Sequence, residues 1–161
     1  NTQVAATGSG SCIVYAYDLN GDGVVAANEL SGFRLNGAVV QMRVSGNTAD
    51  PDTCATASNT WADLTDDDFV SVSALTFNLA ASQCLNTREP DGVDNDGNTV
   101  IDNASEYNCY VAPLPAGGSG NITVETRQIA ITLTGALTND AFVRMSMTQN
   151  VRVRNDWVRV R

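Results

Sequence analysis

The sequence contains no histidine and no lysine, and these two absences exclude several classes of enzyme. Without histidine there is no Ser–His or Cys–His nucleophile pair and no imidazole ligand for a metal. Without lysine there is no Schiff base and no phosphate-binding lysine of the P-loop type. A hydrolase with two catalytic carboxylates stays chemically possible, but no pair of acids in the sequence indicates one. We therefore predict that the protein is not an enzyme.

Long apolar runs and a basic surface are also missing. No apolar run approaches the ~20 residues that span a bilayer. Nine basic residues, all arginine, stand against eighteen acidic ones, and the net charge is -9. This balance disfavours nucleic acid and anionic membranes as main partners, because phosphate contacts need a basic surface. The 161 residues suit one domain, residues 1–161, with its own core. The chain starts at Asn1, and we expect it to be a mature or trimmed fragment.

The four cysteines are widely spaced, without a CxxC motif, which disfavours a zinc site. An even count in an acidic, turn-rich chain predicts two disulfides and an oxidising compartment; buried free thiols are the alternative. Three pairings are possible. We favour Cys12–Cys54 and Cys84–Cys109, because the second pair would close one polar loop into a unit. Each such bond would stabilise the fold by roughly 3–4 kcal/mol.

The hydrophobic pattern has the period of strands, and no helix longer than about a turn is indicated. A single helical turn is expected at "AANEL" (26–30), stopped at Gly32. Residues 1–11 are predicted to be a loose lead-in. An Asn36-Gly37 turn predicts a type I′ hairpin. In 69–80 the alternation places Phe69, Leu75 and Phe77 on one side. Residues 127–137 and 141–156 predict a long antiparallel pair whose last strand has one core face with Val143, Met145, Met147, Val151 and Val153.

Residues 18–29 match the calcium-loop pattern D-x-[DN]-x-[DN]-G-x5-E at every constrained position. Short oxygen side chains at alternate positions converge on one point, Gly23 turns the backbone, and a final glutamate adds two oxygens. The alternative is an Asx/Gly turn without metal. An EF-hand has helices on both sides of this loop, whereas the residues before it predict a strand. The predicted Ca²⁺ ligands are Asp18, Asn20, Asp22, the carbonyl of Val24, and Glu29.

A second acidic stretch lies in the long insertion 81–125, inside the predicted Cys84–Cys109 loop. It is less regular than the first, since Thr99 stands where the pattern has glycine when Asp94 is position 1. Clustered carboxylates repel each other without a cation, which favours a metal over a solvated acidic turn. We predict a second, more tentative Ca²⁺ site with the ligands Asp91, Asp94, Asp96, Asn98 and Asp102, and with Glu106 behind them.

Two further features have a structural and a functional interpretation. Trp61 is more often a core residue than a platform for a sugar. Five of the nine arginines lie in 144–161, where they form either a docking edge for an acidic neighbour or the solvated face of a strand.

The blocks "GSCIVYAYDLNGDGVVAANELSGFRLNGAVVQMR", "WADLTDDDFVSVSALTFNL", "ITLTGAL" and "VRVRND", in this order, resemble the PilW-like minor pilins of type IV pili. These proteins are similar to pseudopilins of the J type. Most of the chain is covered in blocks, with 81–125 outside them. The resemblance implies a C-terminal β-sheet head, and an N-terminal helix that is anchored in the membrane before assembly and is absent from this sequence.

The resemblance and the motifs together give one expected fold and function. The fold class is mainly β, from an α+β pilin parent, with an antiparallel sheet and long disulfide-bridged, metal-binding loops. We expect a minor pilin that helps assemble or prime the fibre by docking to other pilins, outside the cytosol of a Gram-negative bacterium. A membrane would be met only through the missing helix. The alternative is a calcium-dependent adhesin or carbohydrate-binding module.

Overall fold

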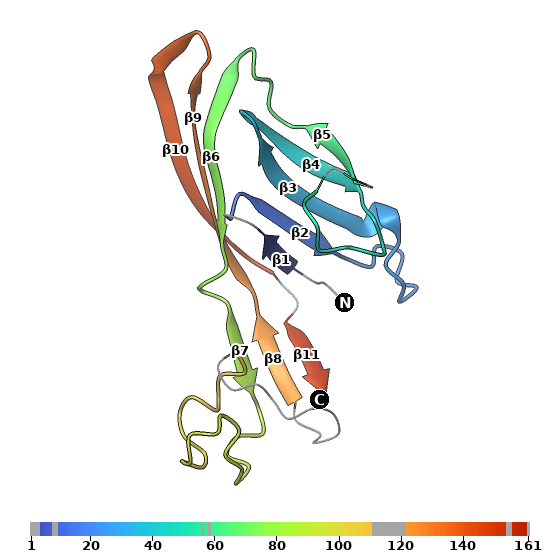
Figure 1. The fold of residues 1–161 in the computed structure, drawn as a ribbon, viewed down its shortest axis with the longest axis vertical. Helices are drawn as coiled ribbons and strands as arrows, with labels where there is room; N and C mark the ends of the chain where they lie inside the picture. The colour runs from blue at the N-terminus through green and yellow to red at the C-terminus, as the bar shows by residue number, and fades with distance from the viewer. Residues whose placement is uncertain are drawn as a thin grey trace. The chain divides into compact units, whose positions relative to one another are not determined.

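The structure, a computed structural model, describes residues 4–7, 10–55, 57, 59–110, 122–153 and 156–160. In this part of the chain the regular structure is strand, apart from one short 3-10 helix. The sheets are antiparallel, as the sequence predicted (Figure 1). The described part contains no helix that is long and apolar enough to cross a membrane. The chain divides into two compact units, residues 1–79 with 130–150 and residues 80–129 with 151–161.

Unit 1 contains a five-stranded sheet in the order β1-β2-β3-β4-β5. Strand β2 fills its core on both faces, because Ile13 and Val14 point to opposite sides and are both buried. The outer strand β1 lies inside the segment 1–11 that we expected to be a lead-in. The strands are β1 (Val4–Thr7), β2 (Cys12–Ala16), β3 (Leu30–Asn36), β4 (Val39–Ser45) and β5 (Thr60–Asp63).

The predicted hairpin at Asn36 is formed by β3 and β4, but the turn differs from the expected type. Asn36 pairs with Val39, so the two loop residues are Gly37 and Ala38. Only Gly37 has a positive φ, of 61°. One positive φ at the first loop position fits a type II′ turn, whereas type I′ needs two. Gly37 is therefore the first residue of the two-residue loop, whereas we expected it to be the second.

A second sheet of unit 1 has the order β10-β9-β6, with β6 (Val70–Asn78), β9 (Gln128–Leu137) and β10 (Asp140–Arg152). The pairing of β6 with β9 shifts register between Val72 and Ala74. A bulge of this kind moves the following side chains to the other face. Val72, Leu75 and Phe77 are therefore buried together, and Phe69, predicted on the same side as Leu75 and Phe77, is 67% exposed.

Strand β10 is the edge of this sheet, and the prediction of a core face on it is wrong. Every residue of the strand is exposed, including Met145 at 74% and Met147 at 54%. The alternation is real, because these residues lie on one face, but no element of the described chain covers them. A shallow cavity of about 250 Å³ opens on this face, between β10 and the strands beside it.

Unit 2 consists of a three-stranded sheet and a long acidic loop. The order is β11-β8-β7, with β7 (Gln83–Asn86), β8 (Ile122–Thr126) and β11 (Trp157–Val160). The predicted insertion 81–125 thus contributes two strands as well as the loop. Arg127 and Glu125 form an ion pair at 3.0 Å with little exposure. Arg152 and Asp156 form a more exposed pair at 3.5 Å.

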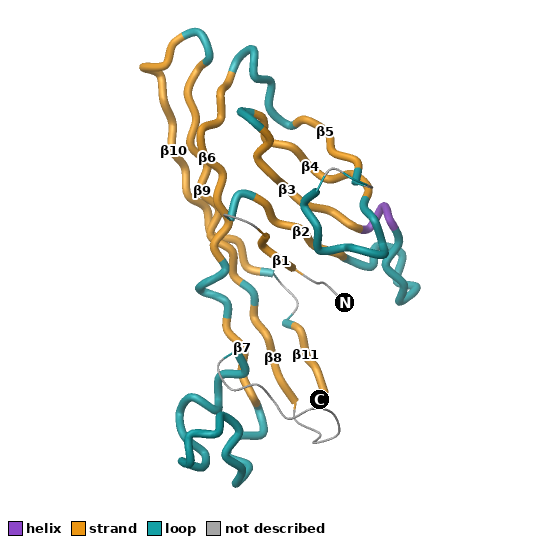
Figure 2. The backbone as a smooth tube through the Cα atoms, viewed as in Figure 1, coloured by secondary structure: helices purple, strands orange, loops and turns teal. Residues whose placement is uncertain are grey.

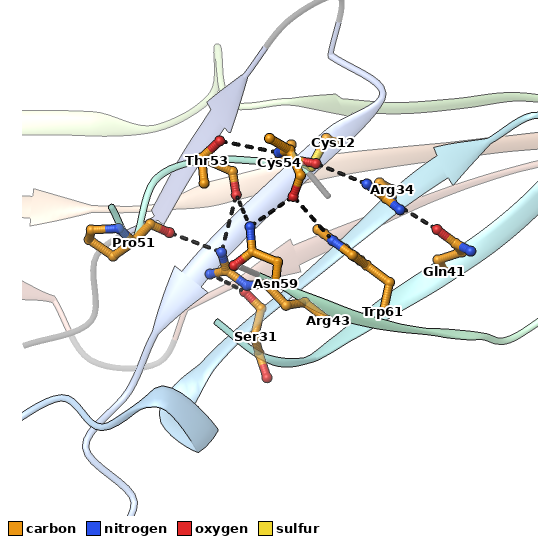
Figure 3. Close-up of a disulfide and its surroundings, with 11 residues drawn as sticks. Cys12, Ser31, Arg34, Gln41, Arg43, Pro51, Thr53, Cys54, Asn59 and Trp61 are labelled. Atoms are coloured by element: carbon orange, nitrogen blue, oxygen red, sulfur yellow. Dashed lines mark hydrogen bonds between the residues drawn. A yellow bond between two sulfur atoms is a disulfide. The ribbon is translucent and has the colours of Figure 1, made fainter. Parts of the chain in front are cut away.

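Both predicted disulfides are present, Cys12–Cys54 and Cys84–Cys109. Around the first one, the fully buried guanidinium of Arg43 fixes the loop between β4 and β5 (Figure 3). It donates to the carbonyl oxygens of Pro51 at 3.1 Å, Thr53 at 3.2 Å and Ser31 at 3.0 Å. One long side chain therefore joins an irregular loop to the sheet where the disulfide also holds it.

Candidate metal centres

Loop 18–29 leaves the end of β2 and returns through the 3-10 helix η1 (Ala27–Glu29) into β3 (Figure 2). A backbone hydrogen bond from Tyr17 to the carbonyl of Glu29, at 3.2 Å, closes its neck. The loop is thus a connection between two paired strands of one sheet, and the single helical turn predicted at its end is present. This geometry positions the loop on a rigid support.

Asp18 organises the first half of the loop. Its Oδ1 accepts hydrogen bonds from the amides of Gly21 at 2.7 Å and Asp22 at 3.1 Å, and its Oδ2 accepts from Gly23 at 2.8 Å. The side chain of Asn20 donates to Asp22 Oδ2 at 2.9 Å. The three backbone amides lower the pKa of Asp18, and the Gly23 amide is the largest cause.

Glu29 closes the second half. Although it is charged, its side chain is only 2% exposed. Its Oε1 accepts from the amide of Leu19 at 2.8 Å, and its Oε2 accepts from Ala26 at 2.9 Å. The last residue of the loop therefore reaches back to its second residue, whereas the calcium-loop pattern assigns both oxygens of the final glutamate to the metal.

The predicted ligands of this loop offer oxygen atoms of the kind that a hard divalent cation binds. A carboxylate has about four acceptor positions, so each oxygen that accepts a backbone hydrogen bond keeps further capacity for a metal. In the described chain, the acids of this loop are not among the groups of three whose oxygens all lie within 4.8 Å of one another. The remaining ligands would be the neutral oxygens of Asn20 and Val24.

A second loop, 94–106, repeats the backbone hydrogen bonds to the opening aspartate. Asp94 Oδ1 accepts from Gly97 at 2.8 Å and Asn98 at 3.1 Å, and its Oδ2 accepts from Thr99 at 2.7 Å. These donors lie three, four and five residues further along the chain, as they do for Asp18. The Asn98 oxygen accepts from Val100 at 2.8 Å, as Asp22 accepts from Val24 at 2.7 Å.

Glu106 occupies the place of Glu29 in this second loop. It is fully buried, accepts from the amide of Asn95 through Oε1, and accepts from Asn103 at 2.7 Å through Oε2. Counted from Asp94 it is the thirteenth residue, one later than the pattern expects. This displacement kept it out of the predicted ligand set, although its burial next to the loop makes it the counterpart of Glu29.

The backbone of the two loops also agrees. Gly21 and Gly23 have φ values of 74° and 79°, and Gly97 and Thr99 have 73° and 72°. The left-handed region is strained for a β-branched residue. Thr99 therefore adopts the conformation of the glycine that the pattern requires, at an energetic cost.

The five residues predicted for the second site belong to two neighbouring groups. Asp94, Asp96 and Glu106 have carboxylate oxygens within 4.8 Å of one another. The hydroxyl of Ser105 is the largest cause of the lowered pKa of Asp96. Asn98 lies with this group through its hydrogen bond to Asp96, at 2.8 Å.

Asp91 and Asp102 form the other group, with Glu89, again with carboxylate oxygens within 4.8 Å. Asp102 Oδ1 accepts from the amides of Asp91 and Gly92, both at 2.9 Å. Burial raises the pKa of Glu89, and the negative charge of Asp91 raises it further. Glu89 was not among the predicted ligands, because it precedes the first aspartate of the motif.

The other candidate residues have structural surroundings. Arg34 lies over the ring of Trp61, 4.2 Å from its centre, and donates to the carbonyl of Cys54 at 3.0 Å (Figure 3). Trp61 is thus part of the support around the disulfide. A third close group of acids, Asp66, Asp67 and Asp68, is fully exposed, as expected of a solvated turn. Of the arginines in 144–161, Arg154 and Arg161 lie outside the described residues.

The sequence model of one protein family, described as prepilin peptidase-dependent protein B, matches residues 1–153. No curated protein gives a significant match to the chain, and no solved structure does so either.

Proposed function

The chain belongs to the prepilin peptidase-dependent protein B family, and on this basis we propose that it is the β-sheet head of a minor, PilW-like subunit of a type IV pilus. It acts by docking to other pilins during assembly or priming of the fibre, and it has no enzymatic activity. The family match over residues 1–153 is the observation that carries this proposal.

The open face of β10 is the docking surface in this proposal. Val143, Met145 and Met147 project from alternate positions of the strand, and each is more than half exposed. Methionine-rich apolar surfaces adapt to the shape of a partner, and an exposed apolar face indicates an interaction site. The cavity on this face is lined by Thr65, Val70, Val72, Leu133, Gly135, Ala136, Leu137, Val143, Arg144, Met145 and Met147.

The partner that fits this face is an apolar pilin helix. Its groove contains one charged residue, Arg144, among apolar and small side chains, so it suits an aliphatic stripe that carries an occasional acid. The resemblance to minor pilins supplies such a helix upstream of Asn1. The two disulfides support a location outside the cytosol, which the proposal narrows to the pilus of a Gram-negative bacterium.

Calcium has a structural role in this proposal. The loop 18–29 bridges β2 and β3, and the buried Glu29 is tied to the loop backbone by hydrogen bonds. A cation here would fix the connection between the two strands. A second ion in 91–106 would do the same for the loop closed by Cys84–Cys109.

A calcium-dependent adhesin or carbohydrate-binding module is the second candidate. The exposed side chains of Leu19 and Val24, within the first loop, favour it, since ligand-binding calcium sites lie open at the surface. The coordination distinguishes the two functions. An ion enclosed by protein oxygens supports the structural role, whereas open coordination positions that a sugar fills would support recognition.

The gene upstream of Asn1 tests the pilin proposal first. We expect a hydrophobic helix preceded by a prepilin-type leader. Absence of that segment would contradict the proposal. A pull-down of the pilus subunits with the full-length protein would then identify the partner, and no pilin in the complex would also contradict it.

A further inference from the structure

Glu89 and Asn95 present buried oxygens that no hydrogen-bond donor satisfies. Glu89 is 9% exposed. Its Oε1 accepts from Asn86 at 2.8 Å and Asn95 at 2.6 Å, whereas its Oε2 is buried and has no partner. Asn95 Oδ1, in the same place, is also buried without a partner. A buried polar atom left unpaired destabilises the folded state, and more so when the group is charged.

These oxygens lie at the group formed by Glu89, Asp91 and Asp102. One carboxylate oxygen of each lies within 4.8 Å of the others, so the carboxylate that carries the unpaired oxygen belongs to a group of three that converge on one place. Asn95 links the group, because its amide donates to Glu89 and, at 3.5 Å, to Asp91 Oδ2. The charges that act on Glu89 are those of Asp91 and Glu106, and both are negative.

A divalent cation satisfies all of these observations together. It accepts the lone pairs of the buried Glu89 Oε2, and it removes the repulsion between the three carboxylates. Oxygen donors without nitrogen or sulfur exclude zinc as the preferred metal and suit Ca²⁺. Ca²⁺ fits better than Mg²⁺, because Mg²⁺ needs a nearly ideal octahedron of ligands and an irregular loop does not impose one.

This group is distinct from the one that resembles loop 18–29. The carboxylates of Asp94, Asp96 and Glu106 form that other group, and the two share no member. Six carboxylates in so short a loop are balanced poorly by one ion of charge +2. Two ions leave the segment with a much smaller residual charge.

We propose that the loop closed by Cys84–Cys109 binds two calcium ions, the second of them at Glu89, Asp91 and Asp102 with Asn95 beside them. The inference does not depend on the pilus or on loop 18–29. It assigns the two aspartates, Asp91 and Asp102, to a site of their own, completed by a buried glutamate that precedes the calcium-loop pattern.

The test is the number of calcium ions bound by the folded, disulfide-bonded chain, measured by competition with a chromophoric chelator. Glu89→Gln should bind one ion fewer than the unchanged protein, and so should Asp94→Asn. The double variant should bind two fewer. Asp91→Asn, at an exposed position, should repeat the loss of Glu89→Gln even if the buried glutamine disturbs folding. The matched control is Asp67→Asn, in the exposed acidic turn, which should lose none.

Two results would overturn the proposal. One is a Glu89→Gln or Asp91→Asn protein that binds as many ions as the unchanged protein. The other is a double variant that loses only one ion, because the two groups would then form a single site. Counting differences rather than totals keeps the outcome independent of loop 18–29, which contributes equally to every variant.

Discussion

Glu29 accepts a hydrogen bond from the amide of Leu19 at 2.8 Å, across ten residues of chain. In the second loop Glu106 accepts from Asn95 in the same way. Glu29 follows its opening aspartate, Asp18, by 11 residues (29 − 18), and Glu106 follows Asp94 by 12 (106 − 94). Each glutamate accepts from the amide of the residue directly after that aspartate. Two segments in separate units of one chain have thus reached one conformation.

Calcium should stabilise the protein through loop 18–29, because an ion that binds only the folded state shifts unfolding by mass action. At one hundred times the dissociation constant, this amounts to about 2.7 kcal/mol, or roughly 5–10 °C in melting temperature for a chain of this size. Asp22→Ala and Glu29→Ala should each remove the part of the gain that this loop supplies. Differential scanning calorimetry with and without chelator measures it. A melting temperature that does not change when chelator is added would contradict the metal assignment.

Thr99→Gly should stabilise the second loop, because glycine adopts a φ of 72° without the strain that a β-branched residue has there. We expect a gain of about 0.5–1 kcal/mol, less than the full strain because glycine also loses more entropy on folding. The measurement is urea unfolding. Gly23→Thr is the matched reverse change, since a Cβ there meets no atom within 4 Å, and it should destabilise the first loop. A Thr99→Gly protein with the same free energy of unfolding as the unchanged protein would show that the strain is not present.

Arg43→Met should destabilise unit 1 by about 3 kcal/mol. The change removes the guanidinium donor from the carbonyls of Pro51, Thr53 and Ser31. Thr53 keeps only the longer hydrogen bond from Asn59, at 3.4 Å. Each buried acceptor that loses its partner costs about 1 kcal/mol or more. Arg43→Lys keeps the charge but not the planar set of donors, so its loss should be intermediate. Chemical unfolding under oxidising conditions gives both values. A loss below about 1 kcal/mol for the methionine variant would contradict the assigned role.

In calcium-free protein, Asp18 should titrate below its ordinary pKa of 3.8, because the amides of Gly23, Gly21 and Asp22 stabilise its charged form. A lowered pKa in the folded state means that the stabilisation is complete above the unfolded value and is lost as the pH falls through the folded value. The carboxyl carbon shift of Asp18, followed by NMR from pH 6 downward, reports this directly. A midpoint at or above the ordinary value would contradict the hydrogen-bond pattern.

Met145→Lys should prevent docking of the head to its pilin partner without unfolding it. The side chain is 74% exposed, so the melting temperature should change little, whereas a charge in an apolar groove opposes the burial of a helix. The readout is the number of pili on cells that express the variant. Phe142→Lys, at a more exposed apolar residue on the opposite face of β10, is the control and should leave the pili intact. Normal pili in the Met145→Lys strain would exclude this face as the docking surface.

The sequence alone predicted the features that depend on local spacing. The β class, both disulfides and the hairpin after Asn36 all follow from residues close together in the chain or from a simple pairing argument. The single helical turn before β3 was also expected, because "AANEL" is short and Gly32 follows it closely.

The features that the sequence did not predict depend on contacts between distant residues. The bulge after Val72 reverses the face of β6, and no residue type marks a register shift. Arg43 is buried by a loop about ten residues away, so its sequence neighbours, typical of a strand, give no indication of it. Glu106 lies one residue later than the pattern expects, and Glu89 joins Asp91 and Asp102 in a close acidic group only in the folded chain.

The ends of the acidic loop meet. Cys84 is bonded to Cys109, Leu85 bridges Asn108, and the amide of Asn86 donates to the carbonyl of Tyr107 at 2.9 Å. The chain between them therefore leaves and re-enters the sheet at nearly one point. We therefore expect that the length and sequence of this loop can change while β7 and β8 keep their pairing.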